Sequence, residues 1–136
     1  MIPKYRIYDK EYNKYCEEPD HRWMLSRNGR LYNSENDKFH IIGERFLVEF
    51  YTGLEDINRI EIFDKDIVKD HAIKQIGVVH FGSPYNNGWE IRYFEDFNGN
   101  PINIENDSDF AWASLTWSSR KDYEVIGNIH ENKNLL

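Results

Sequence analysis

Short apolar segments, each broken by turn-forming residues, run along most of the chain. In the segment 46–51, Phe46, Val48 and Phe50 share one face, because successive side chains of a strand point to opposite sides. The segment 89–93 alternates in the same way. The pattern predicts a mainly β protein, with further strands at 5–8, 23–25, 31–32, 60–63, 67–68, 76–81 and 123–129.

Turn residues separate these segments. Asn28-Gly29 follows one apolar stretch and precedes another, and both residues accept the positive φ of a type I′ turn. We therefore expect a hairpin closed by that turn type. Polar and glycine-containing stretches of the kind that form turns are also found at Thr52-Gly53, 56–59 and 64–66.

Residue types, rather than alternation, predict the local structure of three further segments. The polar stretch 33–40 predicts a loop. Gly77, inside an apolar strand, predicts a bulge or a close backbone approach. The segment 107–119 fits either a short capped helix or a strand.

Several short strands separated by turns are typical of a sandwich or a small barrel. Five segments in the second half are enough to close a barrel of the SH3-like type, by analogy of pattern. We expect one domain over residues 1–136, with an N-terminal β-hairpin subdomain (1–45), an SH3-like β-barrel in the C-terminal two-thirds (46–136), and at most one or two short helices.

Composition favours a folded intracellular protein. The chain has 136 residues, of which 40% are hydrophobic and 15% aromatic, which is enough for a core. Its single cysteine, Cys16, excludes an internal disulfide and suits a reducing compartment. The start of the chain resembles no secretory signal, and no apolar run reaches the length of a membrane span. We expect a cytoplasmic protein, with no membrane partner.

The charge is acidic and unevenly distributed. The net charge of −7 is the sum of +2 over residues 1–30 (seven basic, five acidic) and −9 over residues 31–136 (ten basic, nineteen acidic). Binding to nucleic acid needs Lys and Arg to neutralise phosphates. The charge therefore disfavours a nucleic-acid partner.

Four blocks of sequence carry a family resemblance. The opening block, Lys4 to Lys10, is a short strand that ends in an aromatic residue followed by Asp-Lys. Together with the segments 51–68, 77–81 and 124–132, it resembles the YopX family of proteins from phages and prophages of Gram-positive bacteria. The resemblance implies a β-rich fold and a phage context, and with it a place in the cytoplasm of a host bacterium. It implies no established activity or catalytic residue, so none is transferred.

The chain departs from the family pattern at three turns. Arg59 and Lys65 stand where the family usually has Gly, which takes positive φ at low cost. We expect Asn58 to take that conformation in the first turn, whereas the turn type at Lys65 stays open. Lys133 replaces a frequent Pro, which predicts a less rigid terminal turn.

No motif predicts catalysis or metal binding. Asp64, Asp66 and Asp70 lack the frame of a calcium loop, and we expect them to cap turns. Acidic residues at 105, 107 and 109 are expected to be solvated. Histidines are scattered, with no ligand spacing, at His21, His40, His71, His80 and His130. We expect no enzymatic activity, no catalytic residue, no metal and no cofactor.

Aromatic residues offer the best candidate for a functional surface. Trp89, Tyr93, Phe94, Trp112 and Trp117, with Arg92 and Arg120 near them in sequence, would suit a groove that stacks single-stranded bases. The simpler interpretation is that most of these aromatics fill the core. Tyr85, in a Pro/Asn/Gly loop, is the one most expected to be exposed. The interaction surface that we select consists of Tyr85, Trp89, Arg92, Trp112 and Trp117.

Two functions compete at this point. The first is a non-enzymatic accessory protein that binds a host or phage protein and forms a homo-oligomer, which suits the acidic charge, the aromatics and the sheet edges. The alternative is a nucleic-acid-associated module for phage replication or recombination. The first is our hypothesis, because the second requires a coherent basic groove.

Overall fold

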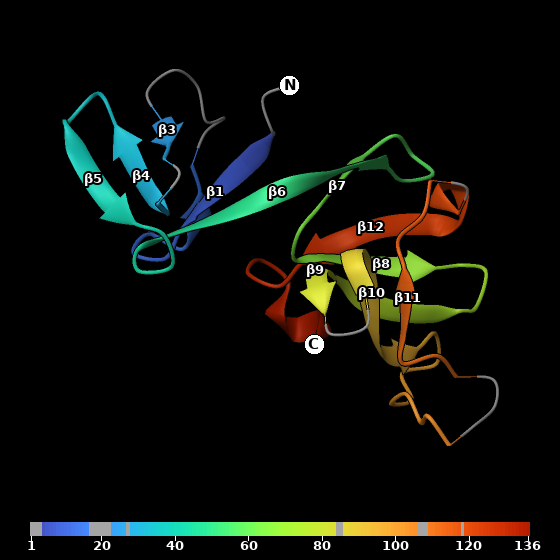
Figure 1. Cartoon of the computed structure of the whole chain (residues 1–136). Helices are drawn as coiled ribbons and strands as arrows, with labels where there is room; N and C mark the ends of the chain where they lie inside the picture. Colours follow the sequence, from blue (N-terminus) through green and yellow to red (C-terminus); the bar gives the residue numbers. More distant parts are fainter. Residues whose placement is uncertain (1–3, 17–22, 27, 84–85, 106–108, 118) are drawn as a thin grey trace. The chain divides into compact units, whose positions relative to one another are not determined.

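Antiparallel strands dominate the computed structural model, which describes residues 4–16, 23–26, 28–83, 86–105, 109–117 and 119–136 (Figure 1). The mainly β prediction is confirmed, and the described helices are two single-turn 3-10 helices. None of the helices among these residues is long and apolar enough to cross a membrane. The chain divides into two compact units, Met1–Tyr51 and Thr52–Leu136, with the boundary inside one strand.

The first unit contains two sheets. Strand β1 pairs antiparallel with β2 and with β6, and β3, β4 and β5 form a separate three-stranded antiparallel sheet. Its core consists of Ile7, Leu31 and Phe46, with half-buried neighbours that include Trp23 and the free thiol of Cys16. The strands are β1 (Tyr5–Asp9), β2 (Lys14–Tyr15), β3 (Trp23–Leu25), β4 (Arg30–Asn33), β5 (Lys38–Ile41) and β6 (Phe46–Glu55).

The predicted hairpin at Asn28-Gly29 exists, but its turn type differs from the prediction. Met24 pairs with Tyr32, and Leu25 pairs with Leu31. Gly29 has a φ of 77°, but its backbone N–H donates a 3.4 Å bond to the Ser26 carbonyl oxygen, and the Arg30 N–H, which would close a type I′ turn, donates instead to Ser26 Oγ at 3.1 Å. The stretch 33–40 is also only partly a loop, because its end belongs to β5.

The second unit is built on a five-stranded antiparallel sheet in the order β11-β10-β9-β8-β12. Val68, Val79 and Ile91 are fully buried on one face of this sheet and share a core with Ile62, which lies outside the sheet, whereas Ile67 is buried on the other face. Its elements are β7 (Glu61–Phe63), β8 (Asp66–Asp70), β9 (Gln75–Ser83), β10 (Asn86–Asp96), β11 (Trp112–Ser114), η1 (Arg120–Asp122), β12 (Tyr123–Asn128) and η2 (Lys133–Leu135).

The prediction of a closed SH3-like barrel over residues 46–136 is wrong. The segment 46–51 was expected to belong to that barrel, but it pairs with β1. The five-stranded sheet ends at β11 and β12, which do not pair with each other in the described part of the chain. Alternating patterns identify strands but not their neighbours, and β11 was only one of two alternatives for its segment. The turn expected at Thr52-Gly53 is also absent, because β6 continues to Glu55.

Gly77 lies where β9 and β10 approach closely, as the sequence predicted. A Cβ atom at this position would lie 2.5 Å from Ile91 Cγ2 and 2.6 Å from the Arg92 carbonyl oxygen. A register shift in β10 between Tyr93 and Glu95 faces the same point. The absence of a side chain therefore lets the bulged strand pack against its neighbour.

Two turn residues that carry a side chain, Arg59 and Lys65, adopt the left-handed backbone conformation that usually favours glycine. Arg59 has a φ of 62° and Lys65 a φ of 71°. The expectation that Asn58 would take this role is therefore wrong. Asp56 Oδ1 holds the first turn by accepting bonds from the backbone N–H groups of Asn58 (2.8 Å) and Ile60 (2.9 Å). Such local bonds make a left-handed non-glycine residue tolerable.

Candidate functional site

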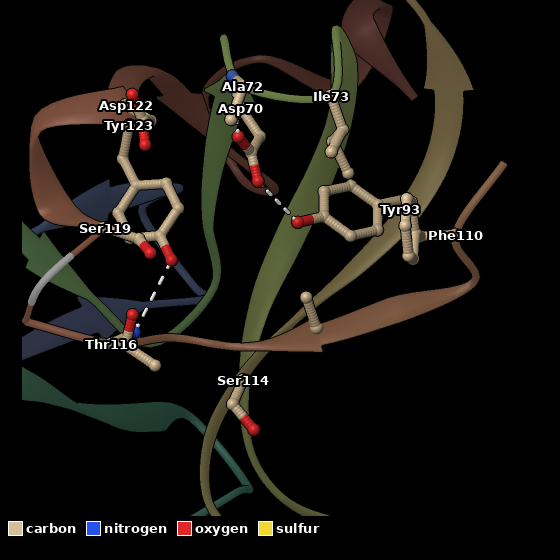
Figure 2. A pocket seen from close by; sticks show the side chains of 11 residues that line it. Asp70, Ala72, Ile73, Tyr93, Phe110, Ser114, Thr116, Ser119, Asp122 and Tyr123 are labelled. Carbon is tan, nitrogen blue, oxygen red and sulfur yellow. Dashed lines mark hydrogen bonds between the residues drawn. The ribbon is translucent and has the colours of Figure 1, made fainter. Parts of the chain in front are cut away.

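A pocket of about 240 Å³ opens over one face of the five-stranded sheet (Figure 2). Buried residues of β8, β10 and β12 line it, and the remaining lining residues come from the loop after β8 and from the segment around β11 and η1. The described residues that line it are Asp70, Ala72, Ile73, Tyr93, Phe110, Ala113, Ser114, Thr116, Ser119, Asp122 and Tyr123.

A buried carboxylate and a buried phenol meet at the base of this pocket. Tyr93 Oη donates a 2.7 Å hydrogen bond to Asp70 Oδ2, and Asp70 Oδ1 accepts a 3.1 Å bond from the backbone N–H of Ala72. Asp70 is 6% exposed, because it ends β8 beneath the loop that follows. The Asp70 bond to Ala72 confirms its expected role in a turn.

A second phenol faces the same space. Tyr123 is the direct cross-strand partner of Asp70, and its Oη accepts a 3.4 Å bond from the backbone N–H of Thr116. Burial, and then hydrogen bonding to Asp70, raise the pKa of Tyr93, and burial also raises the pKa of Tyr123. Both phenols therefore stay neutral, and the charge of the pocket comes from its carboxylates.

The pocket is acidic. Asp70 and Asp122 contribute carboxylates, and the described lining residues include no Lys, Arg or His. Hydroxyl groups of Ser114, Thr116 and Ser119 add neutral polar atoms. Such a lining accepts hydrogen bonds and attracts positive charge, whereas it repels anions.

Acidic residues elsewhere serve turns. Asp66 Oδ2 accepts a 2.8 Å bond from the backbone N–H of Phe63, as expected for a capping residue. Asp109 Oδ2 accepts a 2.9 Å bond from the backbone N–H of Asn103, while Asp107 lies outside the described residues. Throughout the described ranges, no group of three or more His, Cys, Asp or Glu residues is placed to hold a metal ion.

The residues selected from the sequence do not form one surface. Tyr85 lies outside the described residues. Trp89 packs against the core beside Ile91 and Tyr93, with its ring 4.9 Å from that of Phe81. Because side chains alternate along β10, Trp89 and Arg92 belong to opposite faces of the sheet.

Arg92 and Trp112 do come together. They are direct cross-strand partners on β10 and β11, and Trp112 is 37% exposed. Arg92 Nε donates a 2.7 Å bond to Oε1 of the buried Glu90. Trp117 lies beyond β11, and the Arg120 guanidinium covers its ring at 3.7 Å.

His80 lies on the same face of the sheet as Arg92, as the direct partner of Glu90. Its Nδ1 is 3.2 Å from Lys65 Nζ. Burial, assisted by the charges of Lys65 and Arg92 and opposed by Glu90, lowers the pKa of His80 to about 4. The ring is therefore neutral near pH 7.

An exposed apolar face in the first unit was missed by the sequence analysis. Met24, Tyr32 and Phe39 stand directly opposite one another on β3, β4 and β5, and Ile41 follows two residues after Phe39. Met24 is 57% exposed, Phe39 63% and Ile41 53%. We call these four residues, together with Arg30, the outer face of this sheet. The stretch 33–40 reads as a polar loop, which hid Phe39 from the pattern.

Comparison with known proteins places this geometry in context. A family model described as "YopX protein" matches residues 4–136. The crystal structure of protein EF1440 from Enterococcus faecalis is similar, with a TM-score of 0.55 and 24% sequence identity over 100% of this chain and 99% of that chain. At this identity the likeness shows the fold alone. No curated protein matches the chain.

Proposed function

The chain belongs to the YopX family, and from this membership we propose that it is a phage- or prophage-encoded accessory protein that works without catalysis. In this proposal it is a protein–protein interaction module that forms a homo-oligomer. The observation that carries the proposal is the outer face of the β3–β4–β5 sheet, with Met24, Phe39 and Ile41 each more than half exposed.

This face has the composition of an interaction surface. Its apolar side chains are contiguous across three strands, and the rings of Tyr32 and Phe39 lie 4.8 Å apart. Single exposed apolar residues are ordinary on soluble proteins, whereas contiguous ones mark contact surfaces. Aromatic residues and Met are also enriched in such surfaces.

The charges at the two ends of the outer face suit a second copy of the chain. Arg30 is the cross-strand partner of Ile41 at one end. At the other end, Asp37 accepts a 2.6 Å hydrogen bond from Tyr32 Oη. A two-fold axis that lies in the contact plane, perpendicular to the strands, would set each basic end over the partner's acidic end. Such self-complementarity is what an isologous dimer requires.

Sedimentation velocity on the full chain over a concentration series tests this proposal. We expect the mass to rise from one chain to two or more as the concentration increases, after nuclease treatment and without co-purifying nucleic acid. A protein that stays monomeric throughout would contradict self-association. A mass that falls to that of one chain after nuclease treatment would favour the nucleic-acid alternative instead.

A further inference from the structure

We propose that the acidic pocket of the second unit binds a small organic cation, a primary ammonium or a guanidinium group, between the rings of Tyr93 and Tyr123. The carboxylates of Asp70 and Asp122 would serve as its counter-ions. All described residues that line the pocket belong to Thr52–Leu136, so the inference is independent of the outer face and of self-association.

The charge of the pocket selects the sign of the ligand. Asp70 is almost fully buried, and the two hydrogen bonds that it accepts come from neutral donors, Tyr93 Oη and the backbone N–H of Ala72. A buried carboxylate is favoured by a nearby positive charge, which the described lining does not supply. A bound cation would supply it. An anion would instead meet two carboxylates.

The aromatic lining selects an organic cation over a bare metal ion. Tyr93, Tyr123 and Phe110 all line the pocket. The negative face of an aromatic ring attracts ammonium and guanidinium groups, most strongly where water is excluded. In Figure 2 the Tyr93 hydroxyl points toward the space between the two phenol rings, where it meets the Asp70 carboxylate, and the Tyr123 hydroxyl points toward Thr116. A ligand N–H group therefore meets oxygen acceptors and ring faces together.

The volume limits the ligand to a small group. At about 240 Å³ the pocket is smaller than the roughly 300–1,000 Å³ of pockets that enclose drug-sized ligands. Both an alkylamine and the end of an arginine or lysine side chain meet this limit. The shared chemistry is a cationic nitrogen group on a short aliphatic stem, whether it belongs to a free amine or to a peptide.

Titrations followed by amide NMR on the full chain test the inference. The free-amine probe is agmatine and the peptide probe is acetyl-arginine-amide, with acetyl-citrulline-amide as the neutral isostere of the latter. We expect saturable shifts at lining residues, with the isostere about ten-fold weaker or more, because it lacks the charge. Saturation by agmatine alone assigns a free amine, and saturation by the arginine derivative assigns a peptide side chain.

Two variants that each remove one negative charge distinguish binding in the pocket from nonspecific attraction of a cation to the acidic protein. Asp122→Asn removes one carboxylate from the short η1 turn without touching the Asp70–Tyr93 bond. We expect it to weaken binding by about five-fold or more, whereas Glu105→Gln, on an exposed loop, should leave affinity within about two-fold. No saturable shift up to about 20 mM, or equal binding of the citrulline derivative, would overturn the inference.

Discussion

Tyr93 and Asp70 form a buried 2.7 Å hydrogen bond that links β10 to β8 across the intervening strand β9. The two residues are 23 positions apart in sequence, and neither belongs to a recognisable motif. Their bond ties together strands that share no backbone ladder, and it forms the base of the acidic pocket. It therefore connects the stability of the sheet to the shape of its candidate binding site.

Tyr93→Phe tests the energetic weight of this bond. The substitution removes only the hydroxyl and leaves the buried Asp70 carboxylate without its donor. We expect a loss of about 2 kcal/mol in the free energy of unfolding, measured by urea denaturation, since bonds to charged groups contribute about 1.5–3 kcal/mol. Tyr32→Phe, measured at a concentration at which the protein is monomeric, is the matched control, because it removes a 2.6 Å bond to Asp37 on the surface of the single chain. Equal losses in the free energy of unfolding would contradict the claim that the buried bond stabilises the protein more than the exposed one.

Gly77→Ala tests the close approach of β9 and β10. A methyl group would lie within 2.6 Å of the Arg92 carbonyl oxygen, so the strands must separate. We expect a loss of about 3 kcal/mol in the free energy of unfolding. Gly53→Ala separates crowding from backbone strain, because Gly53 has a φ of 88° but open space around its Cα. That control should lose only about 1 kcal/mol. A larger loss for Gly53→Ala than for Gly77→Ala would contradict this account.

Arg59→Gly should stabilise the protein. Arg59 has a left-handed φ of 62°, which is unfavourable for a residue with a Cβ atom. Glycine relieves that strain, although it also raises the conformational entropy of the unfolded chain. We therefore expect a net gain of about 0.5–1 kcal/mol in the free energy of unfolding and a higher melting temperature. Lys65→Gly should gain less, because it also removes the 3.2 Å contact between Lys65 Nζ and His80 Nδ1. A lower melting temperature for Arg59→Gly would refute the strain argument.

His80 should make the fold less stable in mild acid. Its pKa is lowered to about 4 in the folded protein, against about 6.5 in an unfolded chain, so the unfolded state binds the proton more tightly. The neutral His80 ring makes its full contribution to the free energy of unfolding above pH 6.5, and this contribution is lost as the pH falls from 6.5 toward 4. Because the ring is only partly buried, we expect a loss of only about 1 kcal/mol in the free energy of unfolding.

The His80→Gln variant isolates this effect. Urea midpoints measured between pH 7 and pH 4.5 should fall less steeply with acid in the variant than in the native protein. Carboxylates such as Asp9 and Asp96, whose pKa values are lowered by their hydrogen bonds, act mainly at still lower pH in both proteins. If the urea midpoints of the two proteins fall equally steeply with pH, His80 is not the cause of the acid sensitivity.

Local features of the fold follow from the sequence, whereas strand partners do not. The alternation at 46–51 and 89–93 identifies β6 and β10, and the lone Gly77 marks a close approach. The pairing of Tyr5 with Phe50 spans 45 positions, and no local pattern encodes it. The same segment 46–51 was therefore assigned to a barrel that does not form.

The candidate sites were harder to predict for the same reason. The pocket joins Asp70, Tyr93 and Tyr123 from three strands with a segment that was ambiguous in sequence, and only Tyr93 had been considered as a surface residue. The outer face depends on the register that sets Met24, Tyr32 and Phe39 in one row. Periodicity assigns a face within a strand but gives no register between strands.

The central claim is that the outer face of the β3–β4–β5 sheet is a self-association surface, and a matched pair of substitutions tests it most directly. Ile41 on this face is 53% exposed and Ile57, in a turn of the second unit, is 55% exposed. Light scattering coupled to size-exclusion chromatography should show an oligomer for the native protein and for Ile57→Lys, and a monomer for Ile41→Lys at the same concentration. An unchanged oligomer in Ile41→Lys, or its loss in both variants, would contradict the claim.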